Sequence, residues 1–297
     1  MQVSARGIAI EVDDQGPTNG PPVLLIQGLG MQLTDWPQTL VDDLVWRGHR
    51  VLRLDNRDAG LSQGFDELGV PSPVWNGVKH LMHLPVRSPY GLADMAGDAL
   101  GVLDALGLPS AHVVGASLGG MVAQRLAAEH PGRVRSLTLI MTTAGARELP
   151  QPDLNTVRLM QSRPADASPE GLAAHMAGVF NALGSPAWRP DPAAQQAHWL
   201  AQVRRAWRPQ GTLRQLAAVV ADGDRTPLLA RIQAPTHVLH GEADPLVPVA
   251  AAHHLARHIP GATLETIPGM GHDFPVPLMP RWAASIAANA QRFKDTR

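Results

Sequence analysis

Short apolar runs recur along the chain, and each run is closed by turn residues. Several of them are continuously apolar, which is typical of strands buried on both faces of a parallel sheet. The run over 2–12 alternates apolar and polar residues more strongly and predicts an antiparallel edge strand. The strands predicted inside the sheet are 23–28, 51–55, 112–117, 134–142, 236–241 and 262–268.

Helical patterns separate these runs. In 92–106 the apolar residues follow helical spacing, and Gly107 and Pro109 end the helix. Alternation of strands and helices predicts an α/β fold, in which helices cover both faces of a mostly parallel sheet. Further helices are predicted over 118–130, 246–258 and 278–291.

The segment 145–232 departs from this alternation because its sequence predicts several short helices and no strand. An all-helical insertion at this point predicts a cap domain over one end of the sheet. The core domain would then comprise 1–144 and 233–297. Proline at the first helical position marks three of the helix starts, at Ser168–Pro169, Asp191–Pro192 and Thr226–Pro227.

Composition excludes several classes of protein. The 297 residues carry 25 Lys and Arg against 26 Asp and Glu, a net charge of −1, which gives no electrostatic reason to expect a nucleic acid or an anionic membrane as partner. Cysteine is absent, so thiolate catalysis and thiolate metal sites are excluded. Neither a secretory signal nor a run of about 18 uncharged apolar residues is present. A soluble, cytoplasmic protein is therefore expected.

The most specific motif is Gly-Ala-Ser-Leu-Gly over 115–119, a G-x-S-x-G between a predicted strand and a predicted helix. A turn this sharp strains the backbone and needs small neighbours, and it lifts the serine hydroxyl out at the carboxyl edge of the sheet. Ser117 is therefore the candidate nucleophile. The alternative is an ordinary Gly/Ser turn between a strand and a helix.

A serine hydroxyl needs a base within hydrogen-bond reach, and the base needs an orienting acid. Asp244 follows the predicted strand 236–241, and His272 follows the last one. Their order after Ser117 is the order typical of this motif. Glu242 is the alternative acid, Asp244 could instead cap a helix, and His272 could be a loop residue without a role.

The oxyanion that forms during acyl transfer needs preorganised N–H donors. One is expected from the backbone of Leu118, directly after the nucleophile. The other is expected from Leu29, because glycine on both sides of it lets the backbone turn its N–H inward.

The same turn allows a competing interpretation as a dinucleotide-binding site. Gly28 and Gly30 follow a strand, and Asp55 ends the next one. The third glycine of that fingerprint is missing, since position 33 is leucine.

Histidine pairs were considered as metal ligands. His254 and His258 are four apart on a predicted helix, and His80 and His83 are three apart. Neither pair has a carboxylate in zinc-protease spacing, so no metal is expected.

The stretch 55–62 is rich in aspartate. Arg57 lies between Asp55 and Asp58 on a tight turn, and we expect it to fix this loop beside the oxyanion turn through a partly buried ion pair. A direct contact with substrate is the alternative.

Large apolar residues near these motifs predict an apolar pocket for the acyl or alcohol group, although each could equally belong to the core. They are Met31, Trp36, Trp75, Met270 and the tryptophans of the predicted cap, Trp188, Trp199 and Trp207.

Five motifs in order resemble those of the α/β-hydrolase superfamily: LLIQGLG, LDNRDAGLS, GASLGG, HGEADPLVP and GMGHD. The turn at 27–30 and the helix entry at 89–95 are similar to esterases of the aclacinomycin methylesterase type. The resemblance implies an eight-stranded sheet, a helical cap and no cofactor. It also implies, motif by motif, Ser117 as nucleophile, Asp244 as acid, His272 as base, and Leu29 and Leu118 as oxyanion donors. One departure is Gln27, where the family often has histidine.

Hydrolysis of a small-molecule carboxylic ester is the leading functional interpretation. The same side chains could let hydrogen peroxide intercept the acyl-enzyme, as in cofactor-free haloperoxidases, or could hydrolyse carbon–carbon bonds. An interpretation of another class is a catalytically silent binding protein. The absence of aspartate at position 117 argues against the dehalogenase and epoxide hydrolase reactions.

Overall fold

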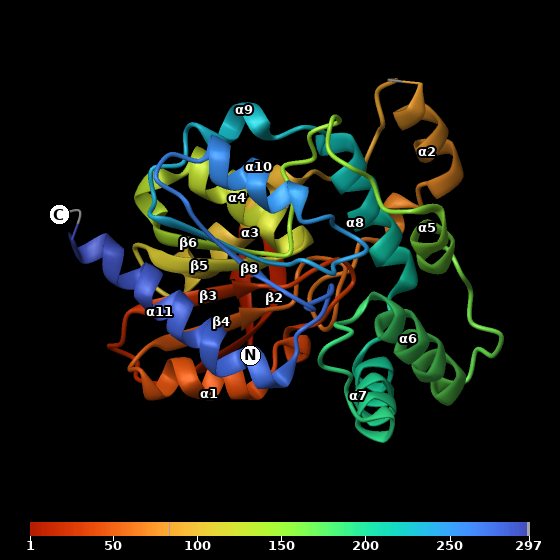
Figure 1. Ribbon diagram of the computed structural model, residues 1–297, viewed down its shortest axis with the longest axis horizontal. Coiled ribbons are helices and arrows are strands. Elements are labelled where there is room, and N and C mark those ends of the chain that lie inside the picture. The colour runs from red at the N-terminus through yellow and green to blue at the C-terminus, as the bar shows by residue number, and fades with distance from the viewer. Residues whose placement is uncertain (83, 296–297) are drawn as a thin grey trace.

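In this computed structural model, which describes residues 1–82 and 84–295, eight strands form one continuous sheet (Figure 1). The strand order is β1-β2-β4-β3-β5-β6-β7-β8, and the strands from β4 to β8 in this order run parallel. The predicted α/β architecture with an eight-stranded, mostly parallel sheet is confirmed. The strands are β1 (Gln2–Ala5), β2 (Ile8–Gln15), β3 (Pro22–Ile26), β4 (Arg50–Leu54), β5 (Ala111–Ala116), β6 (Val134–Ile140), β7 (Thr236–Gly241) and β8 (Thr263–Ile267).

The predicted edge strand 2–12 is a hairpin of two strands. β1 pairs antiparallel with β2, and β2 pairs antiparallel with β4. The two-residue connection has Arg6 at φ 52° and Gly7 at φ 90°, the positive pair that a tight hairpin turn requires. The alternation in the sequence reflects this edge position, since one face of each strand is only partly covered.

Helices cover both faces of the sheet (Figure 1). None of the helices in the described residues is long and apolar enough to span a bilayer. One face carries α1 (Gln38–Trp46) and α11 (Met279–Asp295), and the other carries α3 (Leu92–Ala105), α4 (Leu118–Glu129) and α10 (Ala250–His258). The short helix α2 (Pro73–Leu81) packs beside α8 (Pro209–Asp222).

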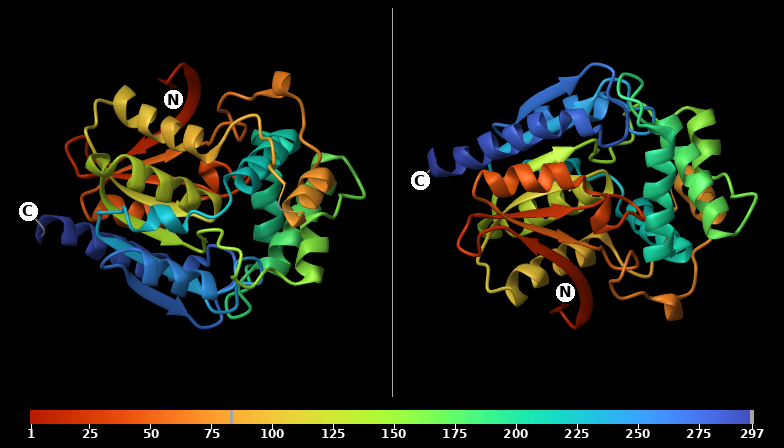
Figure 2. Two further views of the ribbon diagram at one scale, coloured as in Figure 1. Left: turned by 90° about the horizontal axis from the view of Figure 1, so that it is seen from above. Right: turned by 90° about the horizontal axis from the view of Figure 1, so that it is seen from below.

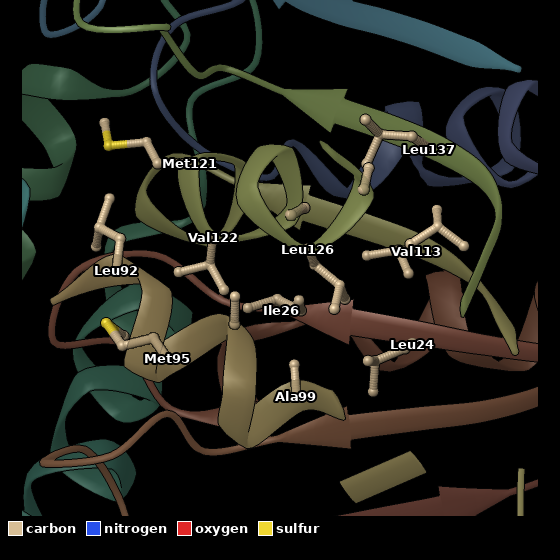
Figure 3. Packing of buried hydrophobic residues seen from close by; sticks show 14 of the residues in the cluster. Leu24, Ile26, Leu92, Met95, Ala99, Val113, Met121, Val122, Leu126 and Leu137 are labelled. Atoms are coloured by element: carbon tan, nitrogen blue, oxygen red, sulfur yellow. The ribbon is translucent and has the colours of Figure 1, made fainter. Parts of the chain in front are cut away.

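The apolar core lies in two layers, one on each side of the sheet. In the first layer the buried stripe of α4 contains Val122 and Leu126, which lie over Ile26 of β3 and Val113 of β5 (Figure 3). The second layer lies under α1 and α11 and is centred on large side chains such as Trp282. The sheet is thus packed on both faces by buried side chains.

Five helices lie between β6 and β7, and we call them the helical insertion. α5 to α8 gather beyond one end of the sheet in all three views (Figures 1 and 2). α9 packs instead against α4, and its Leu229 belongs to the core. The helices are α5 (Leu154–Met160), α6 (Pro169–Leu183), α7 (Pro192–Arg205), α8 (Pro209–Asp222) and α9 (Thr226–Leu229).

Two of the three predicted helix starts have proline at the first helical position and a capping side chain directly before it. The side chain of Ser168 accepts a hydrogen bond from the Gly171 N–H, and that of Asp191 accepts one from the Ala194 N–H. The third prediction is wrong, because Thr226 is itself the first helical residue and donates to Asp224.

The second core layer generates a stability prediction. Trp282 is fully buried on α11, whereas Trp46 on neighbouring α1 is 80% exposed. Trp282→Ala should lower the free energy of unfolding by about 3–5 kcal/mol, since it leaves a cavity that the closed layer cannot fill. Trp46→Ala should change it by less than about 1 kcal/mol. Urea denaturation followed by circular dichroism measures both, and equal losses would contradict the layered core.

Candidate active site

Ser117 lies in a strained turn between β5 and α4. Its backbone has φ 51° and ψ −119°, a conformation that L-residues rarely adopt and that persists only where the surroundings enforce it. The first turn of α4 packs so closely against β3 that position 119 must be glycine, because a Cβ on Gly119 would collide with the carbonyl oxygen of Ile26. The hydroxyl of Thr142 donates to the Ser117 carbonyl at 2.7 Å and fixes the turn from the other side.

Two hydrogen bonds join three side chains that are far apart in the sequence. His272 Nε2 lies 3.1 Å from Ser117 Oγ, and His272 Nδ1 lies 2.7 Å from Asp244 Oδ2. The three residues follow β5, β7 and β8, so parallel strands bring them to one edge of the sheet. This arrangement lets the imidazole accept the hydroxyl proton while the carboxylate orients the ring.

Asp244 is held by its own turn, and a buried histidine lies beside it. Its Oδ1 accepts hydrogen bonds from the N–H groups of Leu246 and Val247 at 2.9 and 2.8 Å. His240 donates from Nε2 to the Val247 carbonyl at 2.7 Å and lies 3.5 Å from Asp244 Oδ2. Burial lowers the pKa of His240, so this ring is neutral near pH 7 and leaves the Asp244 charge facing His272.

Glu242, the alternative acid, lies elsewhere. Its side chain is exposed and accepts a hydrogen bond from the Thr266 hydroxyl of β8 at 2.8 Å. Successive residues after a strand point in different directions, and here only Asp244 points towards His272.

The loop that carries His272 is tied to the end of α6. The His272 N–H donates to the Leu183 carbonyl at 2.8 Å, and the Gly271 N–H donates to Ser185 Oγ at 2.9 Å. Ser185 in turn donates to Asp273 Oδ1 at 2.5 Å, and burial raises the pKa of Asp273. The sequence analysis missed Ser185 and Asp273, since nothing local pairs a serine of the helical insertion with this loop.

The residues 28–31 form a tight turn beside Ser117. The Met31 N–H donates to the Gly28 carbonyl at 3.2 Å, and Gly30 supplies the positive φ of 67°. A Cβ at position 28 would lie 3.4 Å from Ser117 Cβ, so the turn lies directly against Ser117. Within the described part of the chain, the N–H groups of Leu29 and Leu118 have no protein acceptor and are free to bind an oxyanion.

Asp55, considered above as part of a dinucleotide-binding fingerprint, is completely buried. Its oxygens accept hydrogen bonds from the N–H groups of Leu33 and Leu61 at 2.6 and 2.9 Å, and Arg205 of α7 lies 2.8 Å away. Burial raises the pKa of Asp55, and the opposing contribution of Arg205 only partly offsets it. The Asp55 carboxylate thus links three segments: the turn after β3, the turn after β4 and the helical insertion.

A second buried pair joins Asp58 to the helical insertion. Arg214 of α8 lies 2.7 Å from Asp58, and both side chains are at most 1% exposed. Burial alone would raise the pKa of Asp58, but hydrogen bonds from Arg214 and Tyr90 hold it below its usual value.

Arg57 forms a buried ion pair with Asp98 of α3 at 2.6 Å. The expected ion pair is therefore present, and its partner lies on α3. Asp55 and Asp58, the carboxylates on either side of Arg57, pair instead with Arg205 and Arg214 of the helical insertion.

A cavity of about 1260 Å³ opens above Ser117 and His272. Its walls are mostly apolar, and the helical insertion supplies much of them, including Met160, Phe180 and Leu213. Besides Ser117 and His272, six residues that the sequence predicted for the pocket or the oxyanion site line this cavity: Leu29, Met31, Trp36, Leu118, Trp188 and Trp199.

Three expected pocket residues lie elsewhere, which corrects the sequence analysis. Met270 is fully buried in the core under α11, because the chain after β8 turns inward and its backbone pairs with Ala243. Trp75 on α2 is 61% exposed, and Trp207 is 40% exposed, and neither contributes to the cavity wall. Apolar character alone does not distinguish a core residue from a pocket residue.

The histidine pairs take part in ordinary contacts where the structure describes them. His254 contacts the Thr226 hydroxyl at 2.9 Å, and His258 Nδ1 donates to the His254 carbonyl at 2.8 Å. The side chain of His80 and all of His83 lie outside the described residues.

Comparison with known proteins gives relatives along nearly the whole chain. Rhodomycin D methylesterase DauP of Streptomyces sp. (strain C5) is 30% identical, with 91% of each chain covered. A putative carbamate hydrolase, RutD of Variovorax paradoxus (strain S110), is 30% identical over 86% of each chain. The crystal structure of a hydrolase from Pseudomonas aeruginosa PA01 is 27% identical, covers 97% of each chain and superposes with a TM-score of 0.72.

Residues 21–276 match the family described as alpha/beta hydrolase fold. This range begins just before β3 and includes Ser117, Asp244 and His272 together with the whole helical insertion. With the sheet order and the relatives in agreement, the chain belongs to the family of proteins with the alpha/beta hydrolase fold.

Proposed function

We propose that this protein is a serine hydrolase that cleaves carboxylic esters through an acyl-enzyme. The observation that carries the proposal is the pair of hydrogen bonds from Ser117 to His272 and from His272 to Asp244, beside an apolar cavity. The relatives named as methylesterases support an ester as the substrate class.

In the first half-reaction Ser117 Oγ attacks the ester carbonyl carbon as its proton passes to His272 Nε2. The carbonyl oxygen becomes an oxyanion, which the N–H groups of Leu29 and Leu118 stabilise. The intermediate then collapses, the bond to the alkoxy oxygen breaks, and His272 returns the proton so that an alcohol leaves.

In the second half-reaction water attacks the acyl-enzyme. His272 removes the proton from the water, and the resulting tetrahedral intermediate expels Ser117 Oγ, which regains the proton. The acid is released and the enzyme is restored. Asp244 keeps the imidazole in the tautomer that accepts at Nε2 and stabilises the imidazolium that forms in each step.

The helical insertion acts in this proposal as a cap that shapes the substrate site, with 145–232 as the cap domain and 1–144 and 233–297 as the core domain. A cavity of about 1260 Å³ exceeds what a short-chain ester fills, and its apolar walls favour a bulky, largely apolar substrate. An ester of a small alcohol with a large acid fits both this cavity and the names of the methylesterase relatives.

Product analysis distinguishes this function from its alternatives. Ester hydrolysis releases one acid and one alcohol. Perhydrolysis would release a peracid when hydrogen peroxide is present, and a carbon–carbon hydrolase would turn over a ring-cleavage product. A binding protein without activity would leave every ester of a panel intact.

The assignment of the acid is tested by two matched substitutions. Asp244→Asn should lower kcat for an aryl ester by roughly 10³–10⁴-fold, because the amide no longer holds the productive tautomer of His272. Glu242→Gln, the same change two residues away on an exposed side chain, should retain activity close to wild type. Greater loss in Glu242→Gln than in Asp244→Asn would refute the assignment.

The cap role of the helical insertion is tested at Trp199. Its ring lines the cavity and packs on Phe180, with ring centroids 4.5 Å apart. Trp199→Ala should lower kcat/KM for a bulky aryl ester relative to a short one by about 10- to 100-fold, the range expected for a lost apolar contact. Trp207→Ala serves as the control, because Trp207 does not line the cavity. Equal losses for short and bulky esters in Trp199→Ala would show that this tryptophan does not select substrates.

A further inference from the structure

Gln215 of α8 bridges the helical insertion to the turn beside Ser117. Its side chain is fully buried. Oε1 accepts a hydrogen bond from the Gly30 N–H at 2.8 Å, and Nε2 donates to the Arg57 carbonyl at 2.7 Å. One amide thus holds the turn after β3 and the turn after β4 in a fixed relation to α8.

The contact between α8 and the turn is close as well as polar. A Cβ on Gly30 would collide with the side chain of Thr212, so nothing separates the helix from the turn. Arg214, next to Gln215, forms the buried ion pair with Asp58 described above. α8 is therefore anchored on the core at the point where it contacts the turn.

The N–H of Leu29 lies in the same turn, directly before Gly30. In a four-residue turn the orientation of the central peptide groups depends on where both ends are held. One end of this turn contacts Ser117, and the Gly30 N–H is held by Gln215. Without Gln215 the Gly30 N–H would be left without its buried acceptor, and the turn would rotate to find another.

We propose that Gln215 is a positioning residue that holds the Leu29 N–H in the orientation that stabilises the oxyanion. The oxyanion site is then completed by the helical insertion and not by the core alone. This inference rests on the proposed function, since it assumes that Leu29 is an oxyanion donor.

The same helix also faces the substrate site. Leu213, Leu216 and Val219 of α8 line the cavity, while Gln215 contacts the turn. A change in the position of α8 would therefore reach both the substrate-contacting wall and the oxyanion donor.

The test compares two identical substitutions in the helical insertion. Gln215→Met keeps the side-chain volume and removes both hydrogen bonds. Gln202→Met is the control, because buried Gln202 of α7 also bonds the core, accepting from the Thr34 hydroxyl at 2.7 Å, but does not contact the turn at 28–31. Each variant is assayed with a short aryl ester and with a boronic acid that mimics the tetrahedral intermediate.

Gln215→Met should lower kcat by about 10- to 100-fold with little change in KM, since a displaced donor costs less than the roughly 10²–10³-fold loss of a removed one. The affinity for the boronic acid should fall by a similar factor. Gln202→Met should keep kcat and boronic acid affinity close to wild type. Gln215→Glu, which keeps the acceptor for the Gly30 N–H, should recover part of kcat.

Equal kcat values in Gln215→Met and Gln202→Met would overturn the inference, as would a raised KM with unchanged kcat and unchanged boronic acid affinity. If Gln215→Met does not fold, Gln215→Asn replaces it in the test. Its shorter amide cannot reach Gly30, so the same loss of kcat and of boronic acid affinity is expected. An inactive wild-type protein would instead refute the proposed function, so the two failures are distinguishable.

Discussion

The first turn of α4 lies directly against the end of β3, with no space for a side chain at Gly119. This contact forces the backbone of Ser117 into its strained conformation and at the same time brings the turn after β3 beside the serine. The strain is sustained by the buried strands and by the two closed core layers around them. The candidate nucleophile and the N–H groups proposed as oxyanion donors are therefore positioned by one packing constraint rather than by separate features.

The helical insertion is bound to this edge by buried charges and amides. Arg205 and Arg214 pair with Asp55 and Asp58, and Gln215 bonds the backbone on both sides. Buried ion pairs contribute little net stability, but removing one partner leaves an uncompensated charge and costs about 3–5 kcal/mol. Such contacts fix the geometry of attachment more than they strengthen it. The insertion is thus held in one orientation over a site whose walls it supplies.

Much of this arrangement could be predicted from local sequence. Continuous apolar runs located the inner strands, and the glycine-flanked Ser117 marked the turn where β5 meets α4. The order of strands in a parallel sheet explains why Asp244 and His272 reach the same edge. Local sequence does not show which distant side chains form hydrogen bonds or ion pairs with one another. Arg57 was expected to form an ion pair, but its partner, Asp98 of α3, was not predicted, because ion pairs between distant segments leave no periodic signal. For the same reason Met270 was misplaced, since burial depends on the path of the backbone after β8.

Ester hydrolysis as proposed requires Ser117 to be an activated nucleophile. The most direct test of this requirement is reaction of the wild-type protein with a fluorophosphonate, followed by digestion and mass spectrometry. We expect one adduct per chain, located on Ser117, and we expect labelling to be greatly slowed in His272→Ala, because the hydroxyl then has no base. Absence of labelling, labelling at another serine, or an undiminished rate in His272→Ala would contradict it.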